Sequence, residues 1–296
     1  MTAADGFLVV GADSLVGSGL HSALKRRRSR VIASTRRRET LSNDRVFLDF
    51  ENETTFRVPP GIGYVYIVAA ATNYDRCEKD PLAHRINVEL IPRLIASLLE
   101  QDAFVTFIST NSVFGGERPW PAEDDPHAPG IAYARQKSEG ERAIRAAAEV
   151  LGASGRLNVV RLTKILDRNT PPLPAWLASW ARGEAVQPFA DLIFAPMSVR
   201  FVGEALATIG EKRVAGNLHL SGAANVSYVD FANELVDRLK LDRALIAPTT
   251  AVQKGVNIAF KPRYSGLGMQ RTTALTGITP QTISAVVDDL LAENAG

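Results

Sequence analysis

Two residues with complementary chemistry, Tyr133 and Lys137, lie four positions apart in the segment Tyr133-Ala-Arg-Gln-Lys137. On a helix, this spacing places both side chains on one face, one turn apart. A free tyrosine has a pKa of about 10, so it exchanges protons poorly near neutral pH. An ammonium beside it favours the phenolate and lowers that pKa, so we expect the pair to pass a proton to or from a carbonyl or an alcohol. The same spacing also arises by chance on exposed helix faces, so the surrounding chain has to decide between the two interpretations.

The elements that would position this pair are short apolar strands alternating with helices. We expect helices ending near Arg28 and covering about 81–100 and 132–150, and strands at 7–10, 31–34, 46–50, 64–70, 104–108 and 157–162. Continuous apolar strands of this length indicate a parallel sheet that is buried on both faces. The sequence therefore predicts an α/β, Rossmann-type, doubly wound parallel sheet.

The pattern changes after residue 163, where Pro171-Pro-Leu-Pro174 interrupts it. Shorter helices are expected near 175–182, 201–209, 228–239 and 280–293, with a strand near 218–220. We therefore divide the chain into a dinucleotide-binding domain, residues 1–163, and a smaller mixed α/β substrate-binding lobe, residues 164–296. No clear linker separates them, so we expect the lobe to pack on the sheet. Whether some of its helices or strands also join the first domain is left open.

The composition is that of a soluble globular protein, with 46% hydrophobic and 22% charged residues and a net charge of +2. That charge gives no general attraction to nucleic acid or to membranes. The single cysteine, Cys77, excludes an internal disulfide and suits a reducing compartment. Neither a signal peptide nor a bilayer-long apolar run is found, so we expect a cytoplasmic protein. The four histidines lack metal-ligand spacing, and monomer and homodimer both stay open.

A glycine-rich turn lies between the first strand and the first helix. Gly11 and Gly17 would let the backbone approach a pyrophosphate at the N-terminus of the helix, where free N–H groups point at the anion. Leu15 and Val16 lie in the same turn. Ser14 either faces that phosphate or caps the helix. We predict a dinucleotide site here.

The end of the second strand indicates which dinucleotide binds. An acidic residue there would bind the 2′-hydroxyl of NAD. This chain instead has Thr35-Arg36-Arg37-Arg38, and arginines attract a 2′-phosphate, so NADP(H) is favoured over NAD(H) unless these arginines only solvate a loop. Two further segments are candidates for cofactor contact, although capping and helix–sheet packing would also explain them: Asp49-Phe50 and Ala69-Ala70-Ala71.

Taken in order along the chain, these segments resemble the extended short-chain dehydrogenase/reductase superfamily. The matching features are Gly11-x5-Gly17, Ala69–Ala71, Asn87, Ser109-Thr110 and Tyr133-x3-Lys137. A closer resemblance is to dTDP-4-dehydrorhamnose reductases and their sugar-nucleotide-binding relatives. It covers nearly the whole chain and uses the segments Ala71-Thr-Asn-Tyr-Asp75, Ile108–Gly115, Asp191 to Pro196, His219–Gly222 and Lys261–Leu267.

This resemblance implies three catalytic roles. Tyr133 would protonate the substrate oxygen as hydride arrives from NADPH. Lys137 would hold the nicotinamide ribose and lower the pKa of Tyr133, and Thr110 would hydrogen-bond the substrate oxygen. Asn87 would either support a proton-relay water or make a local hydrogen bond.

On the substrate side, the resemblance offers Thr72, Tyr74, Asp75, Asn111, Arg200 and Arg263. An arginine suits a diphosphate bidentately, although surface ion pairing would explain both arginines equally well. Asn111 and Ser112 replace the Asp and Tyr usual in these reductases, which leaves the sugar open. The segment Thr110-Asn111-Ser112 also lacks the carboxyls of a sugar-nucleotide dehydratase.

The leading hypothesis is therefore an NADPH-dependent reductase of a nucleotide-linked 4-keto-6-deoxy sugar, with a nucleotide sugar as its partner molecule. One alternative is a nucleotide-sugar epimerase with bound NAD(P). The other is a non-catalytic NADP-binding regulatory subunit, since the regulatory subunit of methionine adenosyltransferase resembles the same reductases.

Overall fold

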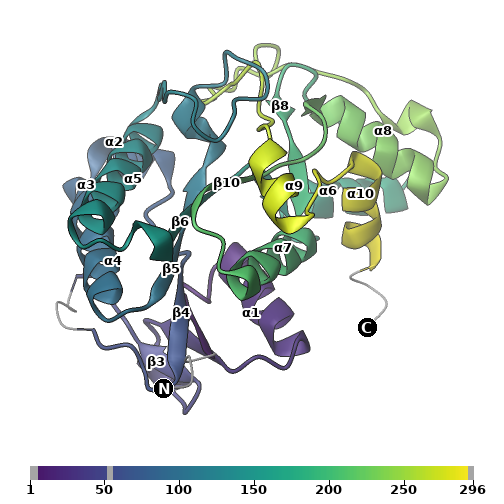
Figure 1. Ribbon diagram of the computed structural model, residues 1–296. Coiled ribbons are helices and arrows are strands. Elements are labelled where there is room, and N and C mark those ends of the chain that lie inside the picture. The colour runs from purple at the N-terminus through teal and green to yellow at the C-terminus, as the bar shows by residue number, and fades with distance from the viewer. Residues whose placement is uncertain (1–5, 52–55, 293–296) are drawn as a thin grey trace.

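The computed structural model describes residues 6–51 and 56–292 (Figure 1). Its strands are β1 (Gly6–Val10), β2 (Val31–Thr35), β3 (Arg45–Phe47), β4 (Ile62–Ile67), β5 (Phe104–Thr110), β6 (Leu157–Leu162), β7 (Lys164–Leu166), β8 (Ile193–Phe194), β9 (Pro196–Ser198), β10 (Gly216–Leu220) and β11 (Val226–Ser227). Its α-helices are α1 (Leu15–Arg26), α2 (Tyr74–Lys79), α3 (Pro81–Arg85), α4 (Ile91–Glu100), α5 (Ala132–Val150), α6 (Leu173–Ala181), α7 (Val199–Lys212), α8 (Tyr228–Leu239), α9 (Gln270–Thr276) and α10 (Ile283–Ala292).

Within the described ranges, seven parallel strands form one sheet in the order β10-β6-β5-β4-β1-β2-β3. The chain moves outward from β1 to β3 on one side and from β4 to β10 on the other. This reversal opens a crevice beyond the carboxyl ends of β1 and β4, which is where ligands of open α/β sheets bind. The predicted fold class is confirmed.

Helices cover both faces of the sheet (Figure 1). On one face, α1 and α7 pack against each other and against the strands, with Leu20, Leu206 and Ile209 fully buried. On the other face, Ile95 of α4 and Ile144 of α5 lie in the second core. Strands buried on both faces explain the continuous apolar runs of the sequence.

A third core lies in the second half of the chain, where α6, α8 and α10 pack together. Its buried residues include Trp176, Trp180, Phe231 and Val286. Two small sheets, β8–β11 and β7–β9, accompany these helices. The second half also contributes α7 to one face of the main sheet and β10 to its edge.

Several elements follow the sequence closely, and others do not. Helix α5 and strand β6 have the predicted bounds. The helix expected at 81–100 is divided into α3, a π-helical turn at Ile86–Leu90, and α4. Helix α2 precedes it and was not predicted, because its six residues are too short for a hydrophobic period to be recognised. Two expectations concern residues that lie partly outside the described ranges. They are the absence of a signal peptide, which involves residues 1–5, and the end of the last helix, which was expected at residue 293.

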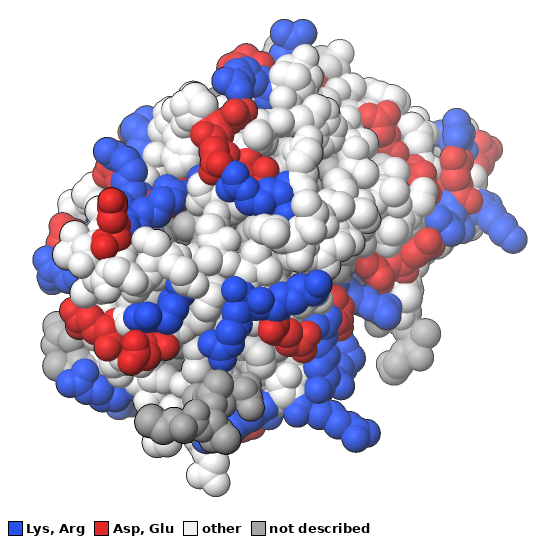
Figure 2. Space-filling model, in the orientation of Figure 1, with Lys and Arg blue, Asp and Glu red and all other residues white. Residues whose placement is uncertain are grey.

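Acidic and basic side chains lie close together over the face shown in Figure 2, without a broad field of one sign. No described helix is long and apolar enough to cross a membrane. Within residues 6–51 and 56–292, no three His, Cys, Asp or Glu side chains are grouped so as to hold a metal ion.

Candidate functional site

The glycine-rich turn is closed so tightly that side chains would not fit. Gly11 has φ +89°, and a Cβ there would lie 2.6 Å from the backbone nitrogen of Ala69. A Cβ on Gly17 would lie 2.2 Å from the Gly11 carbonyl oxygen. Ser14 caps α1, since its Oγ accepts from the Gly17 N–H at 3.1 Å and donates to the Gly11 carbonyl at 2.8 Å. The turn thus holds the N-terminus of α1 at the crevice, as a bound pyrophosphate requires.

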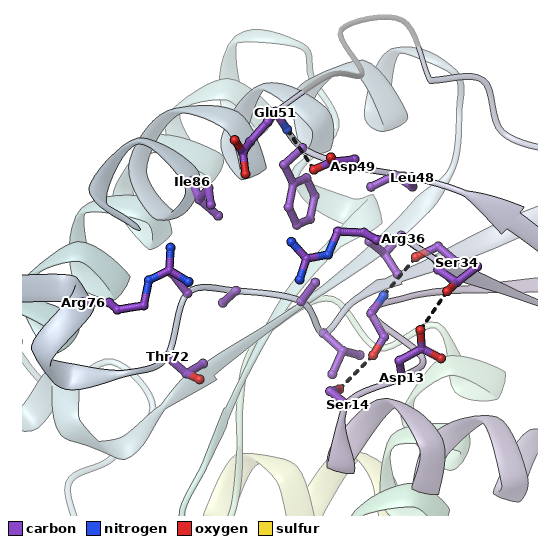
Figure 3. A pocket seen from close by; sticks show the side chains of 18 residues that line it. Asp13, Ser14, Ser34, Arg36, Leu48, Asp49, Glu51, Thr72, Arg76 and Ile86 are labelled. Atoms are coloured by element: carbon purple, nitrogen blue, oxygen red, sulfur yellow. Dashed lines mark hydrogen bonds between the residues drawn. The ribbon is translucent and has the colours of Figure 1, made fainter. Parts of the chain in front are cut away.

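A cofactor-side pocket begins at this turn and runs over the ends of β2, β3 and β4 (Figure 3). It contains most of the residues predicted for the cofactor, namely Gly11, Ser14, Thr35, Arg36, Asp49, Phe50, Ala69, Ala70 and Ala71. Leu15 and Val16 face the neighbouring pocket, described below. The Cβ-free cradle and the donor-rich helix end fit a dinucleotide.

Asp13 was not anticipated as part of this pocket. Its carboxylate accepts a hydrogen bond from the Thr35 hydroxyl at 2.8 Å and forms ion pairs with Arg37 and Arg45. Burial raises the pKa of Asp13, but hydrogen bonds and these arginines outweigh it, so the net pKa is lowered. No local pattern indicates this contact, because Asp13 and Thr35 lie 22 positions apart in the chain.

Two arginines reach into the cofactor-side pocket from opposite sides (Figure 3). Arg36 extends from the end of β2, and no ion pair holds it within the described parts of the chain. Arg76 extends from α2 and is paired with Asp80 at 2.8 Å. Arg37, which was expected to bind the cofactor, does not line the pocket and is engaged by Asp13. Arg36 is therefore the arginine of this loop that is available to an anion in the pocket.

Tyr133 and Thr110 come together at the carboxyl end of β5. The Thr110 side chain lies close enough to the Tyr133 phenol to lower its pKa. Thr110 also accepts from the Ser112 N–H at 3.2 Å, which fixes its hydroxyl at the start of a short 3₁₀ turn. The tyrosine is half-buried, with its ring centroid 5.5 Å from that of Tyr74.

The pKa expected for Tyr133 is wrong for this structure. Burial raises its pKa above the usual value, Tyr74 and Cys77 add to the increase, and the nearby Thr110 side chain offsets only part of it. Lys137 does not act on the phenol, because its ammonium donates to the Ile108 carbonyl at 2.7 Å and lies 3.8 Å from the centre of the Phe107 ring. The tyrosine is thus a neutral phenol near pH 7.

Lys137 is 2% exposed and points toward the carboxyl end of β5. Burial lowers its pKa to about 7, and the carboxylate of Glu141 acts in the opposite sense. One turn of α5 therefore separates the neutral phenol of Tyr133 from Lys137, an amine whose pKa lies near neutral pH. Their placement on one face of α5 is as the sequence predicted.

Asn87 makes local hydrogen bonds, as one of its two interpretations proposed. Its amide nitrogen donates to the Ala71 carbonyl and to Gln136 Oε1, each at 2.9 Å, and its oxygen accepts from the Ala71 N–H at 3.0 Å. Both amide hydrogens are therefore used within the protein. These bonds tie the loop after β4 to α5, which supports the cofactor-side pocket.

A buried ionic network lies beneath the Tyr133 site. Glu141, fully buried on α5, accepts from the Ser109 hydroxyl at 2.5 Å and from two nitrogens of Arg161, the closer at 2.7 Å. Arg161 in turn donates to His219 Nε2 at 3.1 Å. Burial and Arg161 lower the pKa of His219 to about 3, so it is neutral and accepts this bond. The network joins α5 to β5, β6 and β10 immediately below Thr110.

A substrate-side pocket adjoins the first one across Ser14, Val68, Ala70 and Thr72. It brings together Leu15, Val16, Thr72, Tyr74, Thr110, Asn111, Tyr133 and Lys137. Three residues predicted for the substrate do not line it. Asp75 is exposed and paired with Lys79, Arg200 is paired with Asp289 at 3.7 Å, and Arg263 lies over the Tyr264 ring at 5.3 Å.

The substrate-side pocket also has residues that were not predicted to bind the substrate. They come from β7, β8, α8 and the segment before α9, and they include Lys164, Phe194, Tyr228, Phe260 and Pro262. Phe194 and Tyr228 stack at 4.4 Å between ring centroids. Phe194 and Pro262 fall in two of the segments that carry the family resemblance, Asp191 to Pro196 and Lys261–Leu267, but nothing in those segments marks them as substrate contacts. Only the packing of the second half brings these residues to the edge of the sheet.

The fold and this site define a Rossmann-type dinucleotide-binding protein of the extended short-chain dehydrogenase/reductase class. Residues 6–295 match the family model described as the RmlD substrate binding domain, and the chain belongs to that family. The resemblance found in the sequence to dTDP-4-dehydrorhamnose reductases is thereby confirmed.

Individual relatives are distant but extend over most of the chain. A probable dTDP-4,6-dihydroxy-2-methyloxan-3-one 4-ketoreductase of Streptomyces antibioticus is 31% identical over 74% of this chain and 73% of its own length. The methionine adenosyltransferase 2 subunit beta of Pongo abelii is 25% identical over 93% of this chain and 83% of its own. The crystal structure of a dTDP-4-dehydrorhamnose reductase of Bacillus anthracis in complex with NADP has a TM-score of 0.76 at 18% identity, covering 98% of both chains.

Proposed function

We propose that the protein is an NADPH-dependent reductase of a nucleotide-linked 4-keto-6-deoxy sugar. One observation carries the proposal: Tyr133 and Thr110 line the same substrate-side pocket, which adjoins the cofactor-side pocket across Ser14, Val68, Ala70 and Thr72. A carbonyl at this point would lie beside both hydroxyls and within reach of a dinucleotide on the glycine-rich turn. The names of the relatives, several of them ketoreductases or dehydrorhamnose reductases, support the same reaction.

In this proposal each residue of the site has a separate role in the reduction of one carbonyl group. NADPH, when bound, supplies the hydride to the carbonyl carbon. Thr110 donates a hydrogen bond that positions the carbonyl oxygen, and Tyr133 transfers its phenolic proton to that oxygen as negative charge develops on it. The raised pKa of Tyr133 keeps this proton in place until the oxygen becomes basic. Lys137, which the pocket reaches, is placed to hydrogen-bond a nicotinamide ribose.

The choice of NADPH over NADH rests on Arg36. Its guanidinium reaches into the cofactor-side pocket without an ion pair in the described residues, and it is suited to a 2′-phosphate. Asp13 opposes the preference, because its carboxylate lies at the same end of the pocket. Arg37 and Arg45 neutralise that carboxylate, which leaves Arg36 free to bind the phosphate. The NADP held by the Bacillus anthracis reductase is in keeping with this assignment.

The second half of the chain would hold the nucleotide sugar. We retain the division into a dinucleotide-binding part, residues 1–163, and a mainly substrate-binding part, residues 164–296. The support is that Phe194, Tyr228 and Phe260 line the same substrate-side pocket as Thr110 and Tyr133. Aromatic rings suit a nucleobase or the apolar face of a sugar.

The test is consumption of NADPH with a panel of 4-keto-6-deoxy sugars linked to dTDP, GDP, UDP or CDP, with product identification by NMR. We expect stoichiometric NADPH loss and a new secondary alcohol with at least one of them. Epimerised sugar without net NADPH consumption would identify an epimerase instead. A folded protein that binds NADPH but converts none of the sugars would refute the proposal.

A second candidate is a non-catalytic NADP-binding subunit, favoured by the likeness to methionine adenosyltransferase 2 subunit beta over 93% of the chain. Such a protein would bind NADP and a larger enzyme without reducing a sugar. Tyr133→Phe separates the two candidates, since it would leave a regulatory function intact and would abolish the proposed reduction.

A further inference from the structure

Lys164 is a charged residue that lines the substrate-side pocket. It begins β7, directly after the buried Thr163, and its side chain is exposed to the pocket. Throughout the described ranges, no hydrogen bond or ion pair holds its ammonium. The surrounding protein partly desolvates that ammonium and so lowers its pKa. Other lysines of the chain, such as Lys25 and Lys261, are paired with aspartates.

The pocket around Lys164 offers no compensating negative charge. None of the described residues that line it is an aspartate or a glutamate. Its other lysine, Lys137, is buried and already donates to the Ile108 carbonyl. A lysine cation in a pocket without carboxylates is suited to an anionic ligand, with which it would form a charge-assisted hydrogen bond.

The position of Lys164 along the chain indicates which part of a ligand it would meet. Thr110 is in register with Leu162 in the main sheet, so Lys164 lies two residues, or about 7 Å of extended chain, beyond the level of Thr110. It then pairs with Pro196 of β9, on the side of the second-half core. Lys164 therefore lies at the point where the chain passes from the proposed reaction centre toward the elements that carry Phe194 and Tyr228.

A nucleotide sugar has the same order of groups: a sugar carbonyl, then an acidic diphosphate, then an apolar base. We propose that Lys164 is the anion-binding residue of the substrate-side pocket and that it holds an acidic oxygen group of the substrate. The diphosphate is the group this order matches, and a carboxylate on the hexose would offer the same chemistry. The inference rests on the proposed function only in taking the ligand to be a nucleotide sugar. Lys164 thereby takes the diphosphate-binding role that was expected of Arg200 and Arg263, which lie outside the pocket.

The experiment measures binding without turnover, by calorimetric titration of the full chain in the presence of NADPH. The probes are dTDP, UDP, GDP and CDP with their nucleosides, and UDP-glucuronate with UDP-glucose. Three proteins are compared: wild type, Lys164→Gln, and Lys212→Gln as the control. Lys212 is an exposed lysine at the end of α7, outside both pockets, so its variant removes the same charge from elsewhere.

We expect at least one nucleoside diphosphate to bind wild type more tightly than its nucleoside does. Lys164→Gln should weaken that diphosphate about tenfold to hundredfold, as expected for one charge-assisted hydrogen bond, and leave the nucleoside unchanged. Lys212→Gln should match wild type. If the ligand group is instead a sugar carboxylate, Lys164→Gln will weaken UDP-glucuronate selectively and will spare the diphosphates and UDP-glucose.

Two results would overturn the inference. In one, Lys164→Gln binds every diphosphate and UDP-glucuronate as wild type does. In the other, wild type binds each diphosphate no more tightly than its nucleoside, and UDP-glucuronate no more tightly than UDP-glucose. The inference and the proposed function fail separately, because Lys164-dependent binding can be measured in a protein that reduces none of the ketosugars, and reduction can persist in the Lys164→Gln variant.

Discussion

Replacing Glu141 with glutamine should destabilise the protein strongly, because it removes the charge at the centre of the buried network. Burial alone would raise the pKa of Glu141, but hydrogen bonds and charge from Arg161 outweigh it and lower the pKa from 4.5 to about 2. At about 1.4 kcal/mol per pKa unit, this corresponds to roughly 3 kcal/mol of folding free energy at neutral pH. This free energy agrees with the loss of about 3–5 kcal/mol that follows when one partner of a buried ion pair is removed.

The expected shift in melting temperature follows from chain length. An unfolding entropy of about 2.1 cal/mol/K per residue gives, over 296 residues, about 0.6 kcal/mol/K. Loss of about 3 kcal/mol should therefore lower Tm by about 5 °C at pH 7. Circular dichroism melts of wild type and Glu141→Gln measure this difference in Tm, and Glu139→Gln is the control. Glu139 lies on the same helix and is 40% exposed, and its ion pair among the described residues is an exposed one with His84 at 3.6 Å, so its variant should melt within about 1 °C of wild type.

The same carboxylate predicts a pH dependence with a definite sign. A depressed pKa stabilises the fold above the unfolded value of about 4.5, and this stability is lost as pH falls toward about 2. The Tm difference between wild type and Glu141→Gln should therefore shrink progressively below pH 4.5. A variant that melts within about 1 °C of wild type at pH 7, or a difference that grows in acid, would refute the reasoning.

Three further predictions concern the cofactor and the reacting carbonyl. Arg36→Ala should raise KM for NADPH about tenfold or more while leaving KM for NADH nearly unchanged, and an unchanged ratio of the two would count against the 2′-phosphate assignment. Gly11→Ala should prevent NADPH binding in a fluorescence titration, because φ +89° and an Ala69 backbone nitrogen at 2.6 Å leave no space for a Cβ; wild-type affinity would contradict this. Thr110→Ala should lower kcat about 100-fold with NADPH affinity retained, and Thr110→Ser should restore most of it; equal rates for the alanine and serine variants would contradict a hydrogen-bonding role.

Much of the fold could be predicted because it depends on local pattern. The apolar period of α5 defines its ends, and the four-residue spacing places Tyr133 and Lys137 on one face of it. The glycine-rich turn is equally local, since strand, glycines and helix are consecutive. Helix α2 and the π-helical turn were missed because six and five residues are too few to show a period.

The parts of the site that were missed depend on contacts between distant segments. Asp13 meets Thr35 only because β1 and β2 are neighbours in the sheet. Lys164 reaches the substrate-side pocket through the pairing of β7 with β9, and nothing in its local sequence distinguishes it from a surface lysine. Arg200 was expected in the substrate site because an arginine suits a diphosphate, and the structure instead pairs it with Asp289. The pKa of Tyr133 was mispredicted for the same reason, since spacing places Lys137 on its face but does not reveal the Ile108 carbonyl that takes the ammonium.

The most direct test of the account is single-turnover NADPH oxidation by wild type and by Tyr133→Phe, with the nucleotide-linked ketosugar that the panel identifies. The phenylalanine keeps the ring and loses the proton, so the account predicts a fall of about 10² to 10⁴ in the rate of NADPH oxidation, with NADPH and sugar affinities unchanged. A Tyr133→Phe variant that oxidises NADPH at the wild-type rate would contradict the assignment of Tyr133 as the proton donor.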